Sequence, residues 1–283
     1  MGKPLAQVMA IVNRTPDSFY DRGATFAAEQ AQERIDGAVA AGATIIDIGG
    51  VKAGPGDDVT VAEEIERVVP TIALARQRHP HVTISVDTWR AQVADAAIES
   101  GADLVNDTWA GSDPELVEVA GAHRVGYVCS HTGGVTPRTR PHRAQYDDVV
   151  ADVIAETTAL AERAVSLGVP EERVFIDPTH DFGKNTYHGL ELLRRVDELV
   201  ATGWPVLMAL SNKDFVGETL ARGLYGADIT QRVPGTLAAT AWAAARGVAA
   251  FRVHEVEATL DVIRMTAAIQ GDMAPLHTVR GLA

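Results

Sequence analysis

Eight short apolar segments recur along the chain, and longer amphipathic segments separate most of them. The apolar segments lack the polar–apolar alternation of half-exposed strands, so they read as strands buried on both faces. Strands that alternate with helices pair in parallel and are covered by those helices. We place the strands at residues 8–12, 44–48, 82–86, 104–105, 124–129, 173–176, 205–210 and 249–253.

The number of strand–helix units selects the architecture. Eight units within 283 residues fit a TIM (β/α)8 barrel, for which about 250 residues are typical. A doubly wound open sheet is the alternative. No segment rich in Pro, Gly or Ser divides the chain, so residues 1–283 are expected to form a single domain. We place the helices at residues 27–41, 61–78, 90–100, 146–167, 190–201, 236–246 and 255–270.

Charge and composition exclude several classes of function. The chain has 25 Lys and Arg against 38 Asp and Glu, a net charge of −13, which argues against a nucleic-acid partner. An anionic small molecule remains compatible, because local charge can oppose net charge. The single cysteine, Cys129, cannot form an internal disulfide or a Cys-rich zinc site. With no leader-like segment and no apolar run of ~18 to 20 residues, we expect a cytoplasmic protein without a membrane partner.

Polar side chains follow nearly every predicted strand. The carboxyl ends of barrel strands share one rim, where the chemistry of such barrels collects, so these residues are expected to converge. A single Asp, Asn, Ser or Thr could instead cap the following helix, but caps do not account for the whole set. The set includes Asn13, Asp47, Asp87, Asn106, Ser130, His131, Asp177, Lys213, Arg252 and His254.

Two basic residues at the last strand predict an anion site. Arg252 and His254 are two residues apart on a strand, so their side chains point to the same side. A guanidinium beside an imidazole is suited to a diphosphate or a similar anion. The alternative is a structural salt bridge between Arg252 and one of the rim acids.

A second group of rim residues predicts recognition of a heterocycle. Asp87 and Asp177 offer carboxylate acceptors, and Asn106 offers an amide that both donates and accepts. Together they could read a ring edge that carries amino and amide groups. Lys213 could donate to a ring carbonyl, or it could pair with an acid.

The segment at residues 236–246 has an unusual surface. It reads Thr-Leu-Ala-Ala-Thr-Ala-Trp-Ala-Ala-Ala-Arg and has almost no polar face. A barrel helix is normally wet on its outer side, so this helix is expected to be covered. We predict a homodimer contact here. The alternative is an Ala-rich helix packed under a neighbouring loop.

Seven segments, taken together and in order, resemble the dihydropteroate synthase family. The resemblance spans nearly the whole chain and implies the same TIM barrel that the strand count predicts. The segments are residues 13–19, 46–50, 85–88, 105–107, 177–184, 211–217 and 252–254.

The resemblance implies a reaction and a set of ligand-binding residues. In that family a dihydropterin methyl diphosphate condenses with p-aminobenzoate, and diphosphate leaves. Asn13 would help to ligate Mg²⁺ on the diphosphate, with Asp21 nearby. The implied pterin-binding residues are Asp87, Asn106, Asp177 and Lys213. The implied diphosphate-binding residues are Arg252 and His254.

Several family positions are changed in this chain. Residues 49–56 read Gly-Gly-Val-Lys-Ala-Gly-Pro-Gly, whereas the family has Gly-Gly-Glu-Ser-Thr-Arg-Pro-Gly. Residues 211–214 read Ser-Asn-Lys-Asp in place of Ser-Arg-Lys-Ser. His180 and Asp181 stand where small or apolar residues are usual, and Tyr20 and Arg22 replace small residues. The changes fall on the acceptor side and around the rim of the implied pterin pocket.

These departures predict a divergent pterin-diphosphate-binding barrel whose synthase activity is weak or absent. Each lost charge-assisted contact would cost ~1.5 to 3 kcal/mol. One alternative is an active synthase with a rebuilt acceptor site, in which Lys52 replaces the missing arginine. Others are a pterin-dependent methyltransferase and a non-catalytic ligand-binding protein. The sequence does not identify the acceptor.

Overall fold

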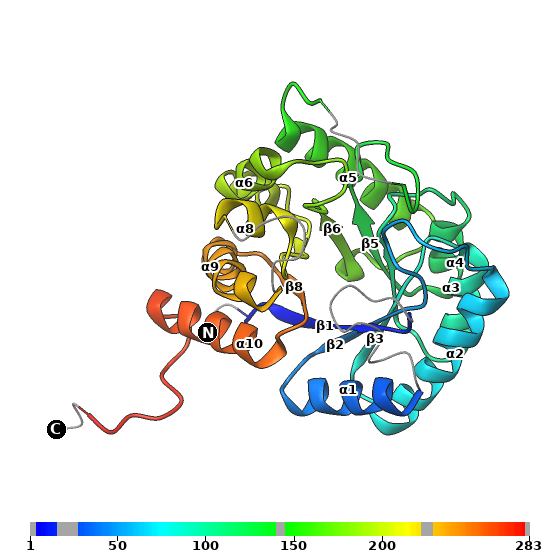
Figure 1. Cartoon of the computed structure of the whole chain (residues 1–283), viewed down its shortest axis with the longest axis horizontal. Helices are drawn as coiled ribbons and strands as arrows, with labels where there is room; N and C mark the ends of the chain where they lie inside the picture. Colours follow the sequence, from blue (N-terminus) through cyan, green and yellow to red (C-terminus); the bar gives the residue numbers. More distant parts are fainter. Residues whose placement is uncertain (1–3, 16–27, 140–144, 222–228, 281–283) are drawn as a thin grey trace.

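Eight parallel strands form one curved sheet at the centre of the molecule (Figure 1). The computed structural model describes residues 4–15, 28–139, 145–221 and 229–280. The strand order is β6-β5-β4-β3-β2-β1-β8-β7. The strands are β1 Gln7–Asn13, β2 Ile45–Gly49, β3 Thr83–Asp87, β4 Leu104–Asp107, β5 Gly126–Ser130, β6 Val174–Asp177, β7 Leu207–Met208 and β8 Ala250–Val253.

The two edges of this sheet meet and nearly close it into a barrel. A single parallel bridge joins Ile176 to Val206, and the Ile176 amide donates to the Pro205 carbonyl at 2.9 Å. The predicted TIM barrel is therefore confirmed, and the open doubly wound sheet is excluded. The strand predicted at 205–210 is only two residues long in the structure, because Val206 makes only the single bridge to Ile176 and the pairing with β8 ends at Met208.

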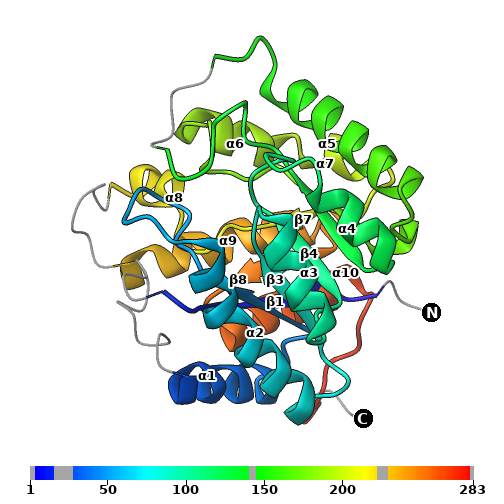
Figure 2. The ribbon, with the colours of Figure 1, turned by 90° about the vertical axis from the view of Figure 1, so that its right-hand side faces the viewer.

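Helices surround the barrel on its outside (Figures 1 and 2). The helix predicted at 190–201 is two helices, because the backbone of Arg195 leaves the helical region. None of the described helices combines the length and hydropathy needed to cross a bilayer. The helices are α1 Ala28–Ala40, α2 Val61–Arg78, α3 Ala91–Glu99, α4 Leu116–His123, α5 Val149–Ser166, α6 Thr186–Arg194, α7 Val196–Val200, α8 Asp214–Thr219, α9 Val233–Ala244 and α10 Val256–Gln270.

The interior of the barrel changes from apolar to polar along the strands. Its amino-terminal half is filled by a separate apolar cluster: Met9, Ile45, Leu104, Val128, Phe175, Leu207 and Ala250. Side chains on a strand face the same way every second residue. Two residues further along four of these strands stand Asp47, Asn106, Asp177 and Arg252. The same inward face thus carries the apolar cluster at one end and polar or charged groups at the other.

Candidate functional site

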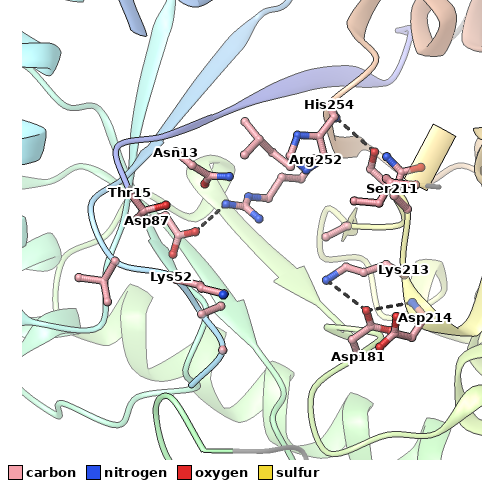
Figure 3. Close-up of a pocket in the computed structure, with 17 residues that line it drawn as sticks. Asn13, Thr15, Lys52, Asp87, Asp181, Ser211, Lys213, Asp214, Arg252 and His254 are labelled. Carbon is pink, nitrogen blue, oxygen red and sulfur yellow. Dashed lines mark hydrogen bonds and ion pairs between the residues drawn. The ribbon is translucent and has the colours of Figure 1, made fainter. Parts of the chain in front are cut away.

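A pocket of about 350 Å³ opens at the carboxyl ends of the strands. Asp87 and Lys52 lie on one side of it, and Lys213, Asp181 and Asp214 on the other (Figure 3). Its polar lining consists of Asn13, Thr15, Lys52, Asp87, Asp181, Ser211, Asn212, Lys213, Asp214, Arg252 and His254.

Arg252 lies at the floor of this pocket between two carboxylates. Its Nε is 2.5 Å from Asp47 Oδ2, and a terminal nitrogen is 2.6 Å from Asp87 Oδ2. Asp47, which is fully buried, also accepts hydrogen bonds from Ser85 at 2.6 Å and Asn106 at 3.1 Å. The salt-bridge alternative for Arg252 is therefore present, and Arg252 still lines the pocket. The three charged groups together carry one net negative charge.

His254 faces the same pocket as a neutral imidazole. Burial, together with the nearby charges of Arg252, Arg34 and Lys213, lowers its pKa to about 3. Its backbone N–H donates to Ser211 Oγ at 3.2 Å, which ties the end of β8 to the loop after β7. Toward an anion, His254 can therefore act as a hydrogen-bond donor at neutral pH, and Arg252 supplies the positive charge.

The three groups predicted to read a heterocycle lie on the same inward face of the barrel. Asp87 is paired in register with Asn106 across β3 and β4. Burial raises the pKa of Asp177 to about 6, although a hydrogen bond from the Thr179 amide at 2.7 Å opposes the shift. Burial also raises the pKa of Asp87 to about 6. Asn106 and Asp177 lie deeper than the lining of the pocket, while Asp87 and Lys213 belong to it.

The pocket wall formed by the segments after β6 and β7 carries acids that the sequence marks as unusual. Lys213 Nζ is 3.7 Å from Asp181 Oδ2, and the Asp214 amide donates to the same oxygen at 3.3 Å. Asp214 in turn pairs with the buried Arg232 at 2.9 Å. On the opposite wall, Lys52 and Ala53 line the pocket from the loop after β2.

The structure therefore brings Asn13, Asp87, Lys213, Arg252 and His254 together around one pocket, with Asn106 and Asp177 below it. Their roles in ligand binding stay predictions. Tyr20, Asp21 and Arg22, which the sequence places on the first loop, lie outside the described residues.

Sequence reasoning missed the central role of Asp47. It placed this residue at the rim without assigning it a partner, yet Asp47 joins Ser85, Asn106 and Arg252 from three other strands. The sequence did carry a signal for this role. Asp47 lies two residues beyond Ile45, an apolar residue on the inward face, just as Arg252 lies two residues beyond Ala250.

His180 is a buried imidazole without a hydrogen-bond partner among the described residues. It stacks on Phe215 with 5.4 Å between ring centroids, and burial lowers its pKa to about 3. A neutral imidazole still carries one N–H, so that donor is left without a partner.

Replacing His180 with leucine is expected to raise the free energy of unfolding by about 1 kcal/mol, because an unpaired buried donor is removed. Urea unfolding at pH 7 measures the change. His188 is a suitable control, since its side chain is less buried and caps α6. A His180→Leu variant less stable than the parent would mean that this imidazole has a partner in solution.

Comparisons with known proteins agree with this geometry. Residues 9–254 match the family described as pterin binding enzyme. A relative from Mycobacterium leprae (strain TN), named inactive dihydropteroate synthase 2, is 61% identical over 290 residues that span 100% of this chain and 98% of that protein. A dihydropteroate synthase from Streptococcus pyogenes is 36% identical over 91% of this chain and 93% of its own length. The structure of the Xanthomonas albilineans dihydropteroate synthase with 4-aminobenzoic acid matches with a TM-score of 0.84 and 37% identity, and covers 94% of this chain and 93% of that one.

Proposed function

Because the chain belongs to the dihydropteroate synthase family of pterin-binding enzymes, we propose that it binds a dihydropterin diphosphate and condenses it with p-aminobenzoate slowly or not at all. One observation carries the proposal. The polar groups on the inward face of the strands lie together around the pocket floor, whereas the positions changed from the family pattern line its walls, with Ala53 on one wall and Asp181 and Asp214 on the other. A synthase needs both a pterin-diphosphate site and an acceptor site, whereas a binding protein needs only the pterin-diphosphate site.

The pterin ring would be held by the groups on the inward face. Ionised carboxylates at Asp87 and Asp177 accept hydrogen bonds from ring amino groups and ring N–H groups, and the Asn106 amide can both donate and accept. The Lys213 ammonium donates to the ring carbonyl. These four residues come from strands β3, β4 and β6 and from the loop after β7, so a flat ligand would contact several parts of the rim at once.

The diphosphate would lie toward β1 and β8. Arg252 supplies positive charge there, and the neutral imidazole of His254 donates a hydrogen bond. Arg252 is already shared between Asp47 and Asp87, so its affinity for an added anion is reduced. We therefore propose that a divalent cation accompanies the diphosphate.

The donors near the diphosphate position fit Mg²⁺. Asn13, at the end of β1, offers an amide oxygen, and Thr15 adds a hydroxyl in the same pocket lining. Mg²⁺ prefers oxygen ligands, retains several waters and is commonly held by one or two protein groups together with phosphates. When bound, the ion would neutralise charge on the diphosphate, and Asn13 would orient it.

The acceptor side disfavours an aminobenzoate. The carboxylate of p-aminobenzoate would approach a wall that carries Asp181 and Asp214 and lacks the family arginine. Opposition between like charges and the loss of a bidentate partner both weaken binding. Lys52 lines the opposite wall, so the second candidate function is a synthase in which Lys52 binds the acceptor carboxylate. The names of the compared relatives favour either of these over a pterin-dependent methyltransferase.

Titration calorimetry with dihydropterin methyl diphosphate, with and without Mg²⁺, tests binding. Complementation of a bacterial strain that lacks dihydropteroate synthase tests turnover. The proposal expects Mg²⁺-dependent binding and no growth of the strain. Growth that a Lys52→Ala substitution abolishes would establish the second candidate function instead.

Pterin affinity is expected to fall by roughly tenfold or more between pH 7 and pH 5. Asp87 and Asp177 both have a pKa of about 6, so about nine-tenths of each is protonated at pH 5 and no longer accepts as a carboxylate. Fluorescence titration with the pterin measures this, and Asp177→Asn should make the dependence shallower. An affinity that is independent of pH over this range would argue against carboxylate recognition of the ring.

We further propose that the chain forms a homodimer through an apolar groove between α6, α8 and α9. The groove is lined mainly by Leu190, Leu193, Phe215, Val216, Leu220, Ala239 and Trp242. Leu220 and Trp242 are 40% and 45% exposed, so apolar surface at this groove is open to contact by a second chain.

Leu220→Glu is expected to convert the dimer to a monomer, because a carboxylate would be buried at the contact. Leu74→Glu is a matched control, since Leu74 is similarly exposed but lies on α2, away from the groove. Sedimentation velocity measures both variants. If the parent protein sediments as a monomer, the dimer proposal is wrong and the Ala-rich α9 needs no second chain to cover it.

A further inference from the structure

A histidine and two carboxylates converge at a place that the proposed pterin function does not use. His131 follows β5, while Asp152 and Glu156 lie one turn apart on α5. His131 Nε2 is 2.9 Å from Asp152 Oδ2 and 3.3 Å from Glu156 Oε2. Among the described residues, this is a group whose ligand atoms all lie within 4.8 Å of one another.

Lys184 contacts the His131 ring at Nδ1, the nitrogen that does not face the carboxylates. Lys184 Nζ is 2.8 Å from His131 Nδ1, and it also donates to the carbonyls of His131 and Phe182 at 3.0 Å each. An ammonium has only hydrogens to offer, so Nδ1 accepts and Nε2 carries the imidazole proton. The ring is fully buried, and its Nε2 is aimed at the two carboxylates. These contacts fix the orientation of the ring, although a metal-ligating histidine usually donates from its second nitrogen.

The imidazole of His131 does not compensate the two negative charges of Asp152 and Glu156. Asp152 and Glu156 lie four residues apart on one helix face, where like charges repel each other. Both converge on an imidazole rather than on a guanidinium or an ammonium, although the Lys184 charge lies behind that ring. A divalent cation between the three side chains would relieve the repulsion. It would bind Nε2 as the imidazole proton moves to Nδ1, which then donates to the Lys184 amine, and Lys184 releases one proton to solvent.

The site is also accessible to an ion. Asp152 forms part of an open hollow between the start of α5 and the start of α6, lined also by Tyr146, Asp148 and His188. The Asp152 and Glu156 side chains are about half exposed. An ion and its waters could therefore reach the group from solvent without any movement of the barrel.

We propose that His131, Asp152 and Glu156 bind a divalent transition-metal ion of the Zn²⁺, Co²⁺ or Mn²⁺ type. One imidazole nitrogen with two carboxylate oxygens is a donor set for these ions, whereas Mg²⁺ and Ca²⁺ prefer oxygen alone. Three protein ligands leave at least one position for water. This site is separate from the Mg²⁺ position near Asn13 and does not depend on the proposed pterin function.

A bound ion would join two parts of the structure. It would fasten α5 to the segment after β5, and through Lys184 to the segment after β6, whose Phe182 carbonyl accepts from the Lys184 nitrogen. That segment also carries Asp181, which lines the pocket. The site is therefore placed to stabilise one wall of the pocket without touching a ligand in it.

Calorimetric titration of the full, metal-free chain with Zn²⁺ tests the proposal, with Co²⁺ as a second probe whose visible absorption reports nitrogen and oxygen ligation. We expect one ion per chain and a raised melting temperature. Glu156→Gln and Asp152→Asn should each weaken binding by about tenfold or more, since even loss of an outer-shell contact costs tenfold to hundredfold. Glu162→Gln, the same change on the same helix two turns away, should leave binding unchanged.

Two results would overturn the proposal. One is the absence of saturable binding by the parent protein. The other is binding that Glu156→Gln and Glu162→Gln affect equally, because the ion would then be held by surface carboxylates in general. The Glu156 side chain is half exposed and Glu162 is also exposed, so the variants are expected to fold, and circular dichroism verifies this.

Discussion

Replacing Arg252 with alanine is expected to lower the free energy of unfolding by about 3–5 kcal/mol. The substitution would leave Asp47 and Asp87 facing each other inside the barrel without a positive partner. Asp47 is fully buried, so water cannot replace the lost guanidinium there. Chemical unfolding at pH 7 measures the loss.

Two further variants decide how this loss is interpreted. Arg78→Ala removes an exposed ion pair with Asp36 and should cost less than about 1 kcal/mol. Adding Asp47→Asn to Arg252→Ala should restore part of the stability, because one uncompensated charge is removed while the hydrogen bonds from Ser85 and Asn106 can persist. If Arg252→Ala costs no more than Arg78→Ala, the three charges do not form a coupled network.

The second large effect is expected at Asp177. Asp177→Asn should weaken binding of the dihydropterin diphosphate by about tenfold to hundredfold at pH 7.5, because charge-assisted hydrogen bonds worth ~1.5 to 3 kcal/mol are lost. The carboxylate is buried at the end of β6 and already accepts from the Thr179 amide. Its remaining lone pairs are what a ring amino group would use.

Asp214→Asn is the matched control for this experiment. Asp214 lines the same pocket, but its carboxylate is exposed and pairs with Arg232, which is not among the residues proposed to hold the ring. We expect it to change pterin affinity by no more than about threefold. Equal losses in the two variants would mean that the ring does not lie over Asp177, and the proposed orientation of the ligand would have to be abandoned.

Much of this fold could be predicted because strands buried on both faces leave a strong sequence signal. All eight strands were expected, and the convergence of rim residues follows from their parallel order. The break at Arg195 and the short helices α4 and α8 could not be predicted, because segments of eight residues or fewer show too little periodicity.

The partners of the site residues were harder to predict than their positions. Arg252 pairs with Asp47 and Asp87 across β8, β2 and β3, and those contacts depend on strand register, which a single sequence does not encode. His131 was placed correctly at the rim, but its ring turns away from the pocket toward α5. Whether a rim side chain faces inward or outward is decided by local backbone geometry after the strand ends.

In the proposed function, the pocket keeps the pterin-diphosphate site and has lost the acceptor site. The most direct test incubates the purified chain with dihydropterin methyl diphosphate, Mg²⁺ and p-aminobenzoate, and measures bound pterin and dihydropteroate in the same sample. We predict stoichiometric pterin binding and product formation at least about a hundredfold slower than that of an active synthase assayed alongside, since several charge-assisted contacts are missing. Turnover at the rate of the active synthase, or no pterin binding at all, would contradict the account.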